Sequence, residues 1–207
     1  MKWNDHSRYE GQHALFSPSQ PSWLRYDDQR FFTFLDNVKA KERGTKMHKF
    51  AQDCIVLGQW LPKKPETTLS LYVNDAISFN MRPEQVLFYS KYFFGTADAI
   101  DFSGGSLLRI HDLKTGTIPG KMDQLLIYDA LFCLEYDIPP EEIGHSLRIY
   151  QFDTFVEHEP SAEEVHSVMD QIQLFNELLL LREEEDNELI IFWTGRRRFV
   201  PSSLWQS

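Results

Sequence analysis

The chain has 207 residues, of which 42% are hydrophobic and 25% are charged. This is enough to bury one sizeable core, so a single domain over residues 1–207 is expected. No apolar run approaches the ~20 residues of a membrane-spanning helix, and the polar start MKWNDHSRYEGQH lacks signal-peptide features, which argues against a membrane protein and predicts a cytoplasmic location.

The net charge of −10 has the opposite sign to that of a typical nucleic-acid-binding protein. Much of the acidic excess falls near the C-terminal end, in the tracts EPSAEEV and REEEDNE. The charge therefore predicts weak, salt-sensitive DNA binding by the free protein, or a partner that delivers DNA.

Helical spacing of apolar residues begins at about Gln29 and continues to Gly58, with a loop or kink near Gly44 as an alternative to one continuous helix. A basic strip compatible with DNA binding surrounds His48, although an ordinary solvated helix face would look the same. Its members are Lys39, Lys41, Arg43, Lys46 and Lys49. Residues 67–80 predict a second helix. Residues 86–94 predict a strand that pairs with the strand following it.

Residues 95–114 predict a β-hairpin, because two stretches rich in β-branched and apolar residues flank SGGS. With Ser103 facing Leu107 across the turn, Asp98 lies opposite Asp112. Side chains alternate between the two faces of a strand. One face is therefore apolar and ends in two carboxylates and an ammonium: Ile100, Phe102, Leu108, Ile110, Asp98, Asp112 and Lys114.

Two opposed carboxylates repel each other unless a cation lies between them, and a divalent metal is the natural candidate. Oxygen ligands with room for water suit Mg²⁺ or Mn²⁺. The neighbouring Lys114 could position a water or stabilise charge that develops on a phosphorane.

A further helix is expected from about Pro119 or Lys121 to Tyr136, with Gln124 and Tyr128 on one side of it. Residues 146–153 predict the next strand, which enters the sheet after this helical crossover, and residues 161–185 predict a long amphipathic helix. The tail, residues 186–207, has no assigned role: a strand, a DNA-contacting arm and an oligomer contact stay open.

Four short motifs occur in an order that resembles the RecB-like branch of the PD-(D/E)XK nuclease superfamily, over roughly Ser17 to Phe155. Each motif is weak alone, and their order together with their predicted helix and strand contexts carries the resemblance. The motifs are GxxxH at Gly44–His48, GxxD at Gly95–Asp98, DxK at Asp112–Lys114 and QxxxY at Gln124–Tyr128. Within this branch the chain is most similar to short phage-encoded exonucleases and to CRISPR-adaptation nucleases.

The resemblance implies an α/β fold with a restriction-endonuclease-like core, a small mixed sheet flanked by helices. It also implies a Mg²⁺- or Mn²⁺-dependent deoxyribonuclease, with an exonuclease expected. The implied metal ligands are His48, Asp98, Asp112 and the backbone carbonyl of Leu113. Catalysis would then rest on Asp98, Asp112 and Lys114, while Gln124 and Tyr128 would contact DNA and brace the site.

The CRISPR-adaptation relatives usually hold an iron–sulfur cluster with four cysteines, whereas this chain has two, Cys54 and Cys133. We therefore expect no iron–sulfur cluster and predict that both cysteines are small core residues.

Two other classes of function stay open at this stage. A catalytically inactive nuclease-fold module could bind DNA or a protein, and an acidic protein could mimic nucleic acid and inhibit a nuclease. The sequence also leaves open end polarity, strand preference, and a protein partner or homo-oligomer.

Overall fold

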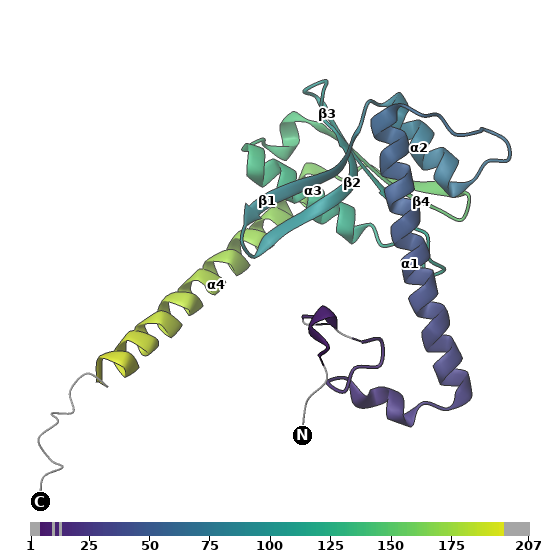
Figure 1. Cartoon of the computed structure of the whole chain (residues 1–207). Helices are drawn as coiled ribbons and strands as arrows, with labels where there is room; N and C mark the ends of the chain where they lie inside the picture. The colour runs from purple at the N-terminus through teal and green to yellow at the C-terminus, as the bar shows by residue number, and fades with distance from the viewer. Residues whose placement is uncertain (1–4, 10, 13, 197–207) are drawn as a thin grey trace, which may run out of the picture. The chain divides into compact units, whose positions relative to one another are not determined.

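The computed structural model in Figure 1 describes residues 5–9, 11–12 and 14–196, with side-chain environments through residue 184. The chain forms two compact units, Met1–Lys46 and Met47–Ser207. Their boundary falls inside helix α1 (Asp28–Leu57), which is one uninterrupted helix, so a loop near Gly44 is wrong. The single-domain organisation stays a prediction.

The first unit contains the 3₁₀ turns η1 (Ser7–Tyr9) and η2 (Pro21–Arg25) and the beginning of α1. Its aromatic side chains pack on one another: the ring of Phe16 lies 5.5 to 5.9 Å, centroid to centroid, from those of Trp23, Phe31 and Phe34.

The second unit is built on a five-stranded mixed sheet with strand order β1-β2-β3-β4-β5. Neighbouring strands are antiparallel except β3 and β4, which are parallel and joined through helix α3 (Asp123–Tyr136). The strands are β1 (Arg82–Ser90), β2 (Phe93–Asp101), β3 (Leu107–Leu113), β4 (Gly144–Gln151) and β5 (Thr154–His158). The predicted α/β fold with a small mixed sheet flanked by helices is confirmed.

The predicted hairpin register is confirmed, because Ala99 pairs with His111 and Ile100 pairs with Ile110. The sheet carries a separate hydrophobic cluster on each face. On one side, Ile100, Leu108 and Ile110 pack with α3 and with Val165 and Ile172 of α4 (Ala162–Arg196). On the other, strand residues join the end of α1 and helix α2 (Thr68–Ser78); the cluster includes Ala51, Cys54, Val73, Ala99, Leu113 and Tyr150.

Helix α3 begins later than predicted, because the loop before it is tied to β4. Gln151 donates from Nε2 to the carbonyl oxygens of Gly116 and Ile118, at 2.7 and 2.9 Å. Its Oε1 accepts from the Gly120 N–H at 3.0 Å. These bonds hold the segment as an irregular loop up to Met122, so Pro119 does not occupy the first helical turn.

Strand β5 was not predicted. It follows a two-residue turn in which Phe152 and Asp153 both adopt positive φ, 55° and 56°. Gly, Asn and Asp dominate such turns, so Asp153 suits its position whereas Phe152 is unusual there. Its conformation is supported from α2, since Asp153 Oδ1 accepts from the backbone N–H of Thr68 at 2.8 Å.

Helix α4 begins as expected, with Ser161 N–H donating to Glu164 Oε2 at 2.8 Å. It extends beyond residue 185 to Arg196, so a strand is wrong for that part of the tail. Residues 197–207 lie outside the described residues. Among those described, no helix is both long and apolar enough to cross a membrane.

Both cysteines are buried, as predicted, and they belong to different clusters.

Cys133 lies beside a buried ion pair, in which His145 Nδ1 is 2.8 Å from Asp129 Oδ2. Burial acts to lower the pKa of His145, but the hydrogen bond and charge of Asp129 outweigh it and raise the pKa above 6.5. The His145 Nε2 atom lies 3.0 Å from the Pro140 carbonyl oxygen, so this group joins α3 to the start of β4.

Replacement of Asp129 by Ala should lower the free energy of unfolding by about 3 kcal/mol, because it leaves a buried partner uncompensated. A raised folded-state pKa means that the His145 contribution is complete below 6.5 and is lost as the pH rises through the folded value. The loss in Asp129→Ala should therefore be larger at acid than at alkaline pH. Urea denaturation at several pH values measures it, with exposed Asp170→Ala as the control.

Candidate metal-binding site

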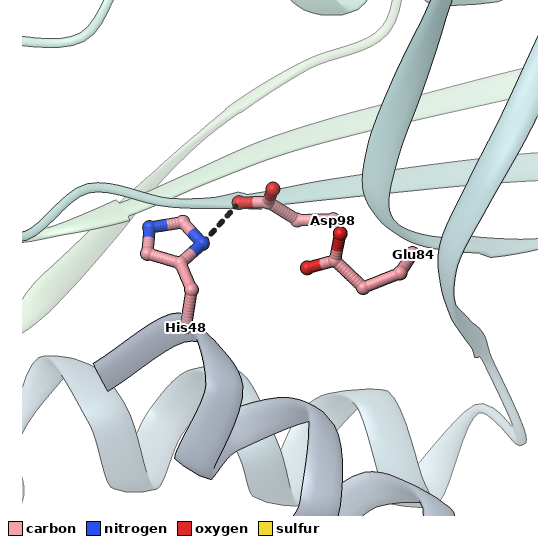
Figure 2. Close-up of side chains that lie close together, drawn as sticks. All are labelled: His48, Glu84 and Asp98. Carbon is pink, nitrogen blue, oxygen red and sulfur yellow. Dashed lines mark ion pairs between the residues drawn. The ribbon is translucent and has the colours of Figure 1, made fainter. Parts of the chain in front are cut away.

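A histidine and two carboxylates meet at the edge of the sheet (Figure 2). They are His48 from α1, Glu84 from β1 and Asp98 from β2, and one ligand atom from each lies within 4.8 Å of the others. His48 Nδ1 is 3.4 Å from Asp98 Oδ2, and both side chains are largely buried, at 32% and 17% exposed. The predicted residues His48 and Asp98 are therefore adjacent.

Asp98 occupies the point where the regular pairing of β2 with β3 ends. The last paired residues are Ala99 and His111, and the next link is made by the side chain, with Leu113 N–H donating to Asp98 Oδ2 at 2.9 Å. This bond fixes the carboxylate beside the strand that carries Asp112 and Lys114. The Leu113 carbonyl as a metal ligand stays a prediction.

Glu84 is not among the predicted site residues, because the strand expected from residue 86 begins earlier, at Arg82. It lies within β1 between the pairs Pro83–Ala99 and Gln85–Ala97, so the register sets it opposite Asp98. Its φ is 52°, in the left-handed region that costs a non-glycine residue roughly 1–2 kcal/mol. Backbone strain of this kind gathers at ligand-binding sites. The local signal in the sequence is only an acidic residue after a proline.

Asp112 lies outside the His48–Glu84–Asp98 cluster and contacts Lys114, whose Nζ is 3.1 Å from Oδ1 and 3.0 Å from Oδ2. The carboxylate is buried, at 3% exposed. Only the contact to Oδ1 has hydrogen-bond geometry, and Oδ2 accepts no hydrogen bond from the described part of the chain. That oxygen is thus a buried acceptor with capacity for a further ligand.

The remaining predicted residues extend a chain of contacts from Lys114. Its Nζ donates to Gln124 Oε1 at 2.8 Å, and Gln124 Nε2 donates to Tyr128 Oη at 3.3 Å. Tyr128 in turn packs over Gly95, where an added Cβ would lie 2.8 Å from Tyr128 Cε1. The glycine of GxxD and the tyrosine of QxxxY are therefore matched sterically, which explains why residue 95 lacks a side chain.

The carboxylates perturb one another. Burial, followed by the charge of Asp98, raises the pKa values of both Asp112 and Glu84. The hydrogen bond to Asp98 raises the pKa of His48 against the opposing effect of burial. A bound cation would relieve this accumulation of negative charge. Carboxylate oxygens with one imidazole suit Mn²⁺ and accept Mg²⁺, so the residues fit the expected ion.

No protein-family model, curated protein or solved structure matches the chain. The RecB-like assignment therefore stays a prediction.

Replacement of Glu84 by Gln or of Asp98 by Asn should weaken Mn²⁺ binding by more than about tenfold, since each removes a charged ligand. Isothermal titration calorimetry measures the dissociation constant. Asp53→Asn is the matched control, because Asp53 is exposed on the same helix as His48 and pairs with Lys49. Unchanged Mn²⁺ affinity in Glu84→Gln would remove Glu84 from the site.

Proposed function

We propose that the chain is a Mg²⁺- or Mn²⁺-dependent deoxyribonuclease that hydrolyses phosphodiester bonds. One observation carries the proposal: Lys114 is held between Asp112 and Gln124, next to the Leu113 backbone that fixes Asp98 in the His48–Glu84–Asp98 cluster. A cluster able to hold a cation beside a positioned ammonium is an arrangement that can stabilise the charge developed in phosphodiester hydrolysis.

The side chains divide the chemistry between them. His48, Glu84 and Asp98 would hold the ion, with Asp112 at its edge. When bound, the ion would polarise the scissile phosphate and lower the pKa of an attacking water. Lys114 would orient that water and donate hydrogen bonds to the phosphorane as negative charge develops. Gln124 keeps the Lys114 ammonium aimed at this place and Tyr128 supports Gln124.

The choice of DNA and of end-directed cleavage comes from the motif resemblance to the RecB-like nucleases. The basic residues of α1 support a polyanionic substrate, since Lys39, Lys41, Arg43, Lys46 and Lys49 are all exposed. The same proposal places the protein in the cytoplasm. For a phage-encoded protein, this is the cytoplasm of the host cell.

The proposal is tested with end-labelled DNA, single- and double-stranded, linear and circular, in Mg²⁺, Mn²⁺ or EDTA. We expect metal-dependent cleavage of linear DNA with circular DNA resistant. Cleavage of circles would indicate an endonuclease. No cleavage with either metal would overturn the proposal in favour of a binding module or an acidic inhibitor. Metal-free binding to DNA and to a nuclease separates those two.

Replacement of Lys114 by Met should lower kcat by roughly 100-fold or more while changing the dissociation constant for DNA less than about threefold, because the ammonium acts mainly on charge in the transition state. Single-turnover kinetics and anisotropy measure the two quantities. Lys63→Met, which removes an exposed lysine in the loop before α2, is the control. Equal losses in rate and binding would make Lys114 a simple phosphate contact.

Replacement of His48 by Ala should remove most activity and any advantage of Mn²⁺ over Mg²⁺, since imidazole suits Mn²⁺ better. Loss of a direct ligand should exceed the roughly 10- to 100-fold effect of changing a residue behind the ligands. The measurements are cleavage rates in Mg²⁺ and in Mn²⁺, and a melting curve. The control is His158→Ala, which breaks the contact to Glu164. Normal cleavage, or unfolding without a metal-specific effect, would make His48 structural.

A further inference from the structure

An apolar groove opens directly beside Lys114. It has a volume of about 560 Å³, and Lys114, Gln124 and Tyr128 form part of its wall. The rest of the lining includes exposed apolar side chains: Ile118 is 82%, Phe94 61% and Ile127 43% exposed. The groove is thus continuous with the candidate active site, and its size is typical of a ligand pocket.

Phe94 contacts Phe88 across the β1–β2 ladder, with ring centroids 6.2 Å apart, yet it stays exposed, and the core does not account for Ile118 or Ile127. The hydrophobic core on this face of the sheet is formed by other residues, including Leu87, Ala97 and Leu125, all fully buried. Phe94 projects from β2 four residues before Asp98, and Ile118 lies in the loop that Gln151 holds in place. Both are therefore held on fixed backbone next to the reaction site while their side chains face solvent.

The apolar side chains that line the groove indicate which part of DNA it can bind. The phosphates are charged and gain nothing from Phe94, Ile118 or Ile127, and the deoxyribose offers only a small apolar surface. In a duplex, the flat faces of the bases are covered by their neighbours and cannot reach a groove wall without unstacking. Unpaired bases present free faces, and stacking on an aromatic ring contributes to affinity regardless of sequence.

The net charge of the protein also favours unpaired bases as the ligand of this groove. A net charge of −10 opposes long-range attraction of DNA. Short-range contacts near the site then matter beside the basic residues of α1, and apolar contact with bases is the kind that this groove offers.

We propose that the groove formed by Phe94, Ile118, Ile127 and Tyr128 binds unpaired bases next to the scissile phosphate, so that the substrate is a single-stranded DNA end. This inference rests on the proposed nuclease function, because it assigns the strand class to that same site.

The test is equilibrium binding of labelled oligonucleotides to the full chain in EDTA, which prevents cleavage. The ligands are a single strand, an abasic strand of equal length and a blunt duplex. Wild-type protein should bind the single strand at least about tenfold more tightly than the abasic strand or the duplex. Phe94→Ala should weaken single-strand binding by roughly 5- to 100-fold, the range for loss of one stacked base, and Ile118→Ser should weaken it through lost apolar contact.

The control variant is Phe152→Ala, which removes an aromatic ring of similar exposure, 60%, at the β4–β5 turn. Melting temperatures establish that the variants fold, and Ile118→Ser changes a side chain too exposed to support the core. Equal affinity for normal and abasic strands, a preference for duplex, or no effect of Phe94→Ala and Ile118→Ser would overturn the inference.

Hydrolysis assays keep this test separate from that of the proposed function. Metal-dependent cleavage without base-dependent binding would overturn the groove and leave the nuclease intact. Base-dependent binding without cleavage in Mg²⁺ or Mn²⁺ would reject the nuclease and support the groove as a single-strand binding site.

Discussion

The repulsion of Asp98 with Glu84 and with Asp112 is the constraint on which the rest of this structure depends. Burial strengthens it most at Asp112, since a carboxylate removed from water loses hydration that would otherwise screen its charge. The fold offsets part of the repulsion with Lys114 beside Asp112 and with the Leu113 N–H donated to Asp98. The remaining negative charge fits the proposed binding of a cation, for which His48 would be the softer ligand.

Several parts of the second unit maintain that arrangement. The register of β2 on β3 sets the Asp98 strand against the Asp112 strand, and the left-handed backbone of Glu84 directs a third carboxylate to the same place. On the opposite side of β2, Tyr128 packs on Gly95 and supports Gln124, which holds Lys114. The position of the Lys114 ammonium therefore depends on helix α3. The positions of the carboxylates depend on the strands of the sheet.

Charge and hydrophobicity are distributed unevenly around this centre. The acidic excess lies partly on α4, whose first turn carries Glu163 and Glu164, while the groove beside Lys114 is predominantly apolar. A polyanion approaching the site meets little attraction from the protein as a whole. Under the proposed function, recognition by shape and stacking beside the His48–Glu84–Asp98 cluster would then be the more effective source of binding energy.

The sequence by itself determined the local parts of this protein. Alternation along residues 95–114 predicted the β2–β3 register up to the Ala99–His111 pair, and helical spacing placed Gln124 next to Tyr128, because both patterns depend only on short-range backbone geometry. Three other features were decided only by the tertiary structure. Glu84 joins the site through the β1–β2 register and a strained φ. The β4–β5 turn has no glycine and is held by Thr68, 85 positions away in the sequence. Helix α3 starts at Asp123 because Gln151 binds the preceding loop. Each of these features is stabilised by a partner distant in the chain, so no local pattern records it.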